Sequence, residues 1–308
     1  MRFSVDPWDP GYGASVDAQL EPSTGDVRLD VEVAPADWRP RRPPASTPVP
    51  AAAIFVDGVR RIDARSWIGT DDGSEAQPGI FASYAAGAVR CEGEHARVVV
   101  AETDHCAVAA SPALTDVATA HATYRAIAAK DAAPESLMYA VHQAMTDAEV
   151  RVAEHARGGG DALVVVDGPL RRREHLPAAV GLVKTHHVRY LPPDADAVVA
   201  SLEAGERTPV FLVASVWNRY SWYVRLARAD GGPWAGIVRC EASPALAPGA
   251  AVELADAVTH ALPRFASEAH KDPRAPQNLY PIGGLERELR RRLGDALLLY
   301  RALRVAAA

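Results

Sequence analysis

Short apolar runs alternate with polar and turn-forming residues through the first half of the chain. Residues 51–58 (AAAIFVDG) form an apolar run that ends in a turn signal, a pattern typical of a buried strand. The same pattern predicts strands at Ile62–Ile68, at Ile80–Cys91 and at residues 96–101. Short connections between these strands favour an antiparallel meander, whereas the acidic segment 102–106 (ETDHC) is expected to be a loop.

The second half of the chain mixes helical and strand patterns. A helix is predicted from about Leu137 to Ala156, and three glycines end it. A strand within residues 161–170 (DALVVVDGPL) follows directly. The remaining predictions are strands at Val210–Val216, Ser221–Leu226 and Ala235–Cys240, and helices at Ala250–Ala266 and Ile282–Leu303. This order of elements predicts a mixed α/β fold.

The first 50 residues have a different character. Residues Asp26–Val33 alternate apolar and polar side chains, as in a half-buried strand. The following segment, residues 39–50, is so rich in proline that an extended linker is expected. We therefore predict an N-terminal extension with its linker at residues 1–50 and a main domain at residues 51–308.

Composition excludes several classes of protein. Of the 308 residues, 48% are hydrophobic and 23% are charged, which is ordinary for a globular protein and unlike a disordered chain. Three separated cysteines form neither a disulfide framework nor a zinc pattern. No export signal is visible, and no apolar run approaches the ~20 residues that cross a bilayer, so we expect a cytoplasmic protein without membrane contact. The net charge of −6 argues against coating nucleic acid by charge alone, but not against a local basic groove.

Two strands are predicted to end in aspartate within the same local pattern. The segments IFVDGVRR and VVVDGPLRR place Asp57 and Asp167 after an apolar run, and each aspartate is followed by glycine and then by arginines. Each Asp-Gly is read either as a tight turn that closes a hairpin or as a carboxylate at a sheet edge. In the second reading the two carboxylates repel each other unless a cation is bound between them, and hard oxygen ligands select Mg²⁺ or Mn²⁺.

Two glutamates on predicted helices are further candidates. Glu149 falls within the apolar stripe of its helix, whereas Glu154 lies on the opposite face. A carboxylate on a core-facing stripe either pairs with an internal arginine or binds a metal. Glu286 borders the apolar stripe of the last helix, where it is either a ligand or a first-turn acid stabilised by the helix dipole.

Basic residues gather beside these candidates. Residues 167–190 contain five basic and two acidic residues, and residues 270–308 contain eight basic and four acidic residues. The arginines at 171–173 are either a solvated face or a phosphate-binding surface. Lys184 is one of only three lysines among 33 basic residues, and we expect it to contact phosphate. No Walker, G-x-G-x-x-G or G-x-S-x-G pattern is present, which argues against an ATPase, a dehydrogenase or an α/β hydrolase.

Taken together, these motifs resemble the NurA nuclease family. The resemblance rests on IFVDGVRR, the helix with Glu149, LVVVDGPLRRR, GLVKTHH and the segment 272-DPRAPQNLYPIGGLERELRRRLGD-295, and it covers most of the chain. The opening MRFSVDPWDPGYG is similar to bacterial members. The resemblance implies an RNase H-like mixed sheet flanked by helices, in which Asp57, Glu149 and Asp167 bind Mn²⁺ or Mg²⁺.

The chain departs from the family pattern at two places. Val59 follows the first Asp-Gly, where the family often has serine, and the family's late histidine is not obvious after Tyr280 and Pro281. The expected site residues are catalytic Asp57, Glu149, Asp167 and Glu286, the first three as metal ligands, with DNA contacts from Arg60, Arg61, Arg171, Arg172 and Lys184.

The resemblance implies a metal-dependent nuclease that processes DNA ends. Such a protein would be a homodimer and would work with a HerA-type hexameric translocase in DNA repair or anti-phage defence. One alternative is a NurA-like subunit with little or no activity that clamps DNA or regulates the translocase. Another is an RNase H-like nucleotide-binding domain.

Overall fold

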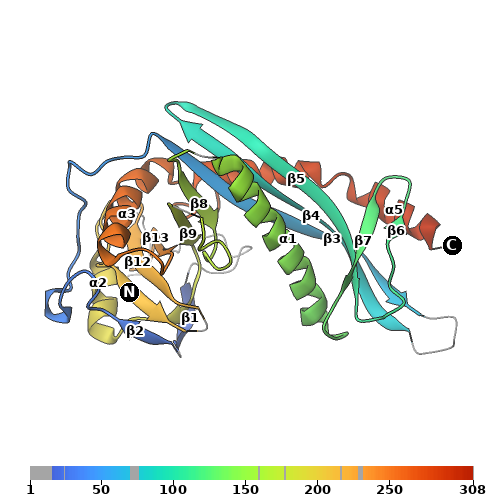
Figure 1. Ribbon diagram of the computed structural model, residues 1–308, viewed down its shortest axis with the longest axis horizontal. Helices are drawn as coiled ribbons and strands as arrows, with labels where there is room; N and C mark the ends of the chain where they lie inside the picture. Colours follow the sequence, from blue (N-terminus) through green and yellow to red (C-terminus); the bar gives the residue numbers. More distant parts are fainter. Residues whose placement is uncertain are drawn as a thin grey trace, which may run out of the picture. The chain divides into compact units, whose positions relative to one another are not determined.

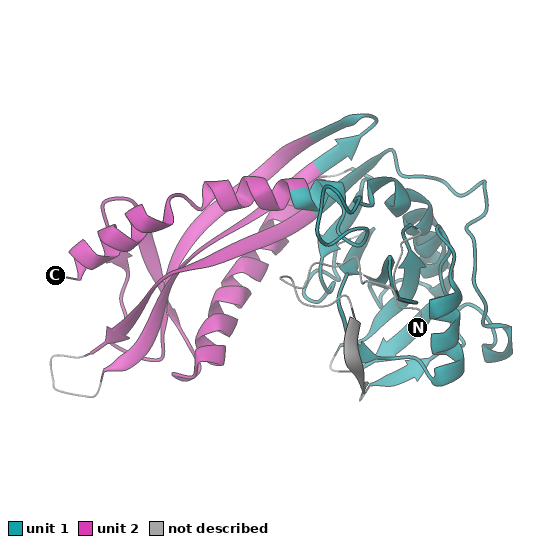
Figure 2. Cartoon of the chain, turned by 180° about the vertical axis from the view of Figure 1, so that it is seen from behind, with its two compact units in different colours: residues 1–55, 90–96, 159–283 teal, residues 56–89, 97–158, 284–308 magenta. Residues whose placement is uncertain are grey.

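The chain folds into two compact units, each assembled from segments that are far apart in sequence (Figure 2). The computed structural model describes residues 16–307 apart from residues 24, 70–75, 159, 177, 216 and 228–231. The opening motif at residues 1–13 therefore lies outside the described residues. Unit 1 comprises residues 1–55, 90–96 and 159–283, and unit 2 comprises residues 56–89, 97–158 and 284–308.

Unit 1 contains most of the short strands (Figure 1). Its elements are β1 (Val16–Pro22), β2 (Asp26–Arg28), β8 (Leu163–Asp167), β9 (Ala179–Val183), β10 (His186–Arg189), α2 (Pro193–Ser201), β11 (Phe211–Ala214), β12 (Arg219–Arg225), β13 (Ile237–Ala242) and α3 (Pro248–Ala261). The strand order is β2-β11-β12-β13-β9-β8, followed by β3, which contributes its first residues to this unit. Strands β8 and β9 are parallel, and the other pairs from β9 to β2 are antiparallel. Strands β1 and β10 form a separate parallel pair.

Part of the expected N-terminal extension belongs to the fold of unit 1. Strand β2 pairs with β11, and the Trp38 ring packs against Phe211 at 6.0 Å between centroids. Glu32 accepts a 2.7 Å hydrogen bond from Nη1 of Arg207, whose side chain is 1% exposed and also pairs with Asp256 of α3. A buried carboxylate between such donors fixes this segment to the sheet. The expected domain boundary at residue 50 stays a prediction.

Unit 2 is built on three long strands. Its elements are β3 (Ala52–Ile68), β4 (Gln77–Glu92), β5 (His95–Ala109), β6 (Val117–Ala118), β7 (Thr123–Ala128), α1 (Pro134–Arg157), α4 (Tyr280–Arg292) and α5 (Ala296–Ala306). Strands β3 and β4 and helix α4 each have a few residues in unit 1, as does β5. The order is β3-β4-β5-β7-β6, and α1 covers one face of this sheet while α4 and α5 cover the other (Figures 1 and 2).

The fold confirms the mixed α/β class with helices on both faces of a mixed sheet. The strands β3, β4 and β5 follow one another in sequence and lie side by side in the sheet. Helix α1 comes later in the chain, and β8 then pairs on the other side of β3. This is the order expected for an RNase H-like sheet. Helix α1 confirms the predicted helix and ends at Arg157, with Gly158 as its C-cap at a φ of 54°. Among the described residues, none of the helices combines the length and the apolar content that crossing a membrane requires.

Three predicted boundaries are wrong. The predicted strands at 51–58 and 62–68 form one 17-residue strand, β3, which runs through Asp57 and Gly58 without a turn. Residues 102–106 lie inside β5 and are not a loop. The last predicted helix is two helices, because Gly294 has a φ of 76° and Asp295 caps α5 by accepting a 2.8 Å hydrogen bond from Leu298 N.

Candidate functional site

Asp57 is a buried carboxylate inside the apolar part of β3. Residues Ala52–Val56 are all buried, and Asp57 follows them with 7% exposure. Its Oδ1 accepts a hydrogen bond of 2.8 Å from the backbone N of Gly58. Burying an ionised carboxylate costs several kcal/mol unless charges or donors compensate it. This position is therefore a strong candidate for chemistry.

Helix α4 brings a second carboxylate to Asp57. Glu286 presents an oxygen within 4.8 Å of an oxygen of Asp57, and both residues belong to unit 2. The helix approaches the sheet closely at Gly87 of β4, where an added Cβ would lie 2.9 Å from Leu289 and 3.0 Å from Leu285. The glycine thus permits the packing that places Glu286. Two carboxylates so close favour a cation between them.

Glu149 confirms the expectation that it faces the interior, since its side chain on α1 is 5% exposed. It lies against the residue after Asp57, because a Cβ on Gly58 would be only 2.3 Å from Oε1 of Glu149 and 2.9 Å from Cγ of Met145. The absence of a side chain at Gly58 therefore lets α1 approach β3 closely. The carboxylate oxygens grouped within 4.8 Å of one another include Asp57 and Glu286 but not Glu149. A metal-ligand role for Glu149 stays a prediction.

Asp167 is the last residue of β8 in unit 1. Its Oδ2 accepts a 2.7 Å hydrogen bond from Nζ of Lys184, whereas its buried Oδ1 has no hydrogen-bond partner among the described residues. The strand end is held in place because Gly168 N donates to Leu182 O at 2.8 Å. A buried carboxylate oxygen without a donor is typical of a group that binds something else.

Lys184 belongs to a buried hydrogen-bond network that joins Asp167, Asn278 and Asp272. Its Nζ also donates to Oδ1 of Asn278 at 2.8 Å, and Nδ2 of Asn278 donates to Oδ2 of Asp272 at 2.7 Å. The two bonds use two of the three ammonium hydrogens. Asn278 and Asp272 were missed as site residues, although both lie in the family-like segment 272–295. Contact between Lys184 and phosphate stays a prediction.

The predicted DNA-contacting arginines differ in their surroundings. Arg60, Arg171 and Arg172 are exposed, and Arg172 has a positive φ of 72° in the segment after β8. Arg61 instead donates to the backbone oxygens of Leu293 and Gly294, at 3.1 and 2.8 Å, at the end of α4. The Arg61 guanidinium thus caps that helix, and its role in DNA binding stays a prediction that these contacts do not favour.

A buried polar cluster in unit 2 lies next to Arg61. Asp63 accepts hydrogen bonds from Nε of Arg61 at 2.8 Å, from the hydroxyl of Tyr124 at 3.1 Å and from Ser83. Nδ1 of His105 lies 2.8 Å from Oγ of Ser83, and burial lowers the pKa of His105. Because Ser83 is 0% exposed and donates to Asp63, its oxygen is not a nucleophile open to substrate. We read this cluster as support for the sheet under α4.

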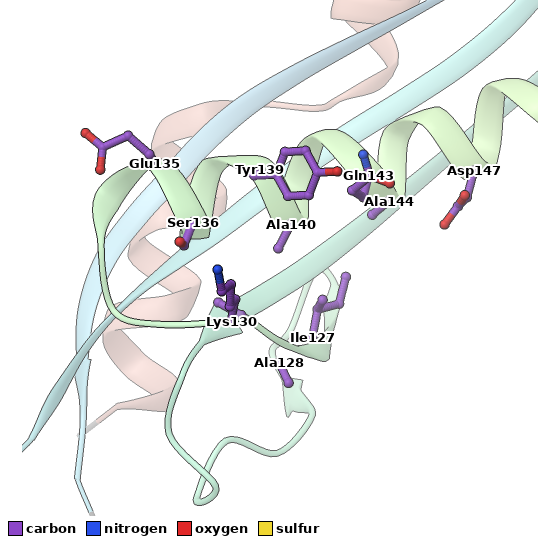
Figure 3. Close-up of a pocket in the computed structure, with 11 residues that line it drawn as sticks. Ile127, Ala128, Lys130, Glu135, Ser136, Tyr139, Ala140, Gln143, Ala144 and Asp147 are labelled. Carbon is purple, nitrogen blue, oxygen red and sulfur yellow. The ribbon is translucent and has the colours of Figure 1, made fainter. Parts of the chain in front are cut away.

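A surface groove of about 610 Å³ lies between α1 and β7 of unit 2 (Figure 3). Its floor is apolar, with Ile127, Ala128 and Ala140, and Tyr139 stands over it. Glu135, Asp147 and Lys130 supply charge at its margin. None of the candidate carboxylates lines this groove, so it is separate from the site.

The sequence matches no protein-family model and no curated protein. Among solved structures, the Sulfolobus solfataricus NurA nuclease matches with a TM-score of 0.42 and 10% identity over 83% of this chain and 84% of that chain. The catalytic domain of human endonuclease V matches with a TM-score of 0.35 and 15% identity over 83% and 91%. The Bacillus subtilis endonuclease V matches with a TM-score of 0.32 and 11% identity over 82% and 86%. All three are nucleases, but at these TM-scores and identities they do not assign this chain to a family. Membership of the NurA family stays a prediction.

Proposed function

We propose that this protein is a metal-dependent DNA nuclease that hydrolyses phosphodiester bonds. The observation that carries the proposal is the pair Asp57 and Glu286, whose carboxylate oxygens lie within 4.8 Å of each other in unit 2. Oxygen ligands of this kind fit Mn²⁺ or Mg²⁺. When bound, such a cation supplies a more acidic water and neutralises charge that develops on the phosphate.

We place Asp167 and Glu149 in the same site. Strand β8 neighbours β3 in the sheet order, and both strands carry an aspartate after a fully buried apolar run. The buried Oδ1 of Asp167 without a donor supports its use as a ligand. Glu149, which lies over Gly58, would complete the ligand set or orient a water beside it.

The basic residues have a separate role in this proposal. Lys184 holds one oxygen of Asp167 and keeps one ammonium hydrogen for a phosphate oxygen. The exposed side chains of Arg60, Arg171 and Arg172 contact the backbone without reading the base sequence. In this proposal these side chains supply the positive charge that the substrate needs, although the whole chain carries a net charge of −6.

The biological setting in this proposal comes from the sequence resemblance alone. We infer a cytoplasmic homodimer that processes DNA ends with a HerA-type hexameric translocase, in repair or in anti-phage defence. Co-elution of the chain with such a translocase, and its mass in solution, test these two points separately from catalysis.

A nuclease assay tests the proposed activity. Linear and circular DNA are incubated with the protein in Mn²⁺, Mg²⁺ or EDTA, and the same assay is run on Asp57→Asn and Glu286→Gln. The matched control is Glu288→Gln, because Glu288 lies on the same helix but pairs with Arg292 at 2.9 Å on the surface. We expect metal-dependent loss of linear DNA that disappears in both site variants and persists in the control. DNA binding without cleavage under every metal condition would instead identify a non-catalytic clamp.

A further inference from the structure

Helix α4 presents two flanks of different character on either side of its buried stripe. The buried side chains are Ile282, Leu285, Leu289 and Leu293, and two of these, Leu285 and Leu289, lie against Gly87 of the sheet. At 100° per residue, Glu286, Arg290 and Arg287 follow in that angular order on one side of this stripe. Glu288 and Arg292 fall on the opposite side, and Arg291 lies between the two flanks. The face of the sheet with α4 is turned toward the viewer in Figure 2.

On the far flank, one carboxylate pairs with two arginines. Glu288 accepts from Nε of Arg292 at 2.9 Å and also from Arg291. These are the i,i+4 and i,i+3 pairs that stabilise exposed helices. Arg291 and Arg292 are therefore both engaged in ion pairs within the helix.

The flank of Glu286 is different. Arg287 and Arg290 are exposed, and neither forms a hydrogen bond or an ion pair with any residue that the structure describes. The carboxylate on the same flank is Glu286, one residue before Arg287 and four before Arg290, and it lies close to Asp57. This flank therefore has the same formal charge as the other, one glutamate and two arginines, but no carboxylate that the structure describes pairs with its two guanidinium groups, which lie on the same side of the helix as the proposed metal ligand.

We infer that Arg287 and Arg290 bind the phosphate backbone of the nucleic acid on which the carboxylates act. The inference rests on the proposed function and extends the DNA-binding surface to a helix outside the predicted contacts. The two residues are about 4.5 Å apart along the helix axis, and their long side chains can reach neighbouring phosphates. A guanidinium matches a phosphate with two parallel hydrogen bonds, and such contacts position a strand without selecting a base. Glu286 and these arginines would thus reach the same strand from one helix.

Binding measured without cleavage tests the inference. A labelled linear duplex is titrated with the full-length protein in EDTA, by fluorescence anisotropy, over a series of NaCl concentrations. The test variant is Arg287→Gln/Arg290→Gln, and the control is Arg291→Gln/Arg292→Gln. Both variants remove two positive charges from the same helix, so any effect of net charge alone is equal in the two.

We expect the slope of log affinity against log salt to fall by about 1.8 in the test variant, since each lost phosphate contact contributes roughly 0.9. The control variant should keep the slope of the wild type, and Arg287→Lys/Arg290→Lys should recover most of it. Equal slopes in all variants, or equal losses in test and control, would overturn the inference. Thermal denaturation of each variant checks that exposed substitutions leave the fold intact.

The outcomes separate this inference from the proposed function. Metal-dependent cleavage that requires Asp57, together with an unchanged salt slope in the test variant, refutes the role of this flank and leaves the nuclease standing. A reduced slope without any cleavage by the wild type supports the binding flank and refutes the nuclease. Absence of DNA binding by the wild type refutes both.

Discussion

Replacing Lys184 by methionine removes the positive charge that unit 1 holds against Asp167. The Lys184 side chain is 9% exposed and that of Asp167 is 16% exposed, so water compensates little of the loss. The substitution breaks hydrogen bonds of 2.7 Å to Asp167 and 2.8 Å to Asn278. Removing one partner of a buried ion pair costs about 3–5 kcal/mol, and the residual exposure of Asp167 favours the lower end. At roughly 2–4 °C per kcal/mol for a chain of this size, we expect Tm to fall by about 6–12 °C without metal.

Mn²⁺ should partly restore the stability of this variant. If Asp167 is a metal ligand, a bound cation replaces the missing ammonium charge, and a tenfold gain in affinity adds about 1.4 kcal/mol at high metal concentration. The Mn²⁺-induced rise in Tm should therefore be larger in Lys184→Met than in the wild type. Thermal denaturation with and without Mn²⁺, followed by circular dichroism, measures both quantities.

Lys271→Met is the matched control, because Lys271 also lies in unit 1 and pairs with a carboxylate, Glu268, at 3.1 Å on the surface. Exposed ion pairs contribute little to stability because water and salt screen them, so this variant should stay within a few degrees of the wild type and keep its response to Mn²⁺. Equal Mn²⁺ responses in Lys184→Met and wild type would show that Asp167 does not share in binding the metal. A Tm unchanged by Lys184→Met would refute the stated cost.

Two further predictions concern Gly58 and Glu32. Gly58→Ala puts a carbon 2.3 Å from Glu149 Oε1, so we expect a loss of about 1–3 kcal/mol in urea denaturation and weaker cleavage. In Gly284→Ala the new carbon meets no atom within 4 Å outside its own helix backbone, so this control should cost nothing. For Glu32, burial raises the pKa, but the hydrogen bond and charge of Arg207 outweigh it, and the pKa is lowered below 4.5. A lowered folded-state pKa contributes stability above the unfolded value that is lost as pH falls through the folded value, so the stability difference between wild type and Glu32→Gln should shrink below about pH 4.5. A difference independent of pH would contradict this assignment.

The interior glutamate was predictable because its signal is local. The apolar stripe of α1 consists of residues three and four positions apart, so the sequence alone predicted that Glu149 is buried and Glu154 is exposed. The position of Glu286 beside Asp57 was harder to predict from the sequence. It depends on how closely α4 packs on β4, which Gly87 permits from a different part of the chain.

Of the two readings of Asp57-Gly58, the tight turn is wrong, and the reason is physical. Asp-Gly is a strong local turn signal, but the glycine here removes a side chain from beneath Glu149 in a continuous strand. The break between α4 and α5, in contrast, did have local signals in Gly294 and the N-cap Asp295. The apolar repeat on both sides of that break hid them.

Long-range polar partners could not be predicted at all. Asn278 meets Lys184 across 94 positions, and Arg207 meets Glu32 across 175 positions. Such pairs depend on the order of strands in the sheet, and hydrophobic patterns do not specify that order when short strands can pair in several ways. For the same reason the sequence did not predict that β2 pairs with β11 at the edge of the sheet in unit 1.

The most direct measurement of the central claim is the Mn²⁺ dependence of linear DNA cleavage by wild type, Glu286→Gln and Glu288→Gln. If Glu286 shares a cation with Asp57, the Glu286 variant should need at least tenfold more Mn²⁺ for half-maximal rate or lose activity altogether. The Glu288 variant, which alters only surface ion pairs with Arg291 and Arg292 on the same helix, should match the wild type. Cleavage in EDTA, or identical Mn²⁺ curves for all three proteins, would contradict the account.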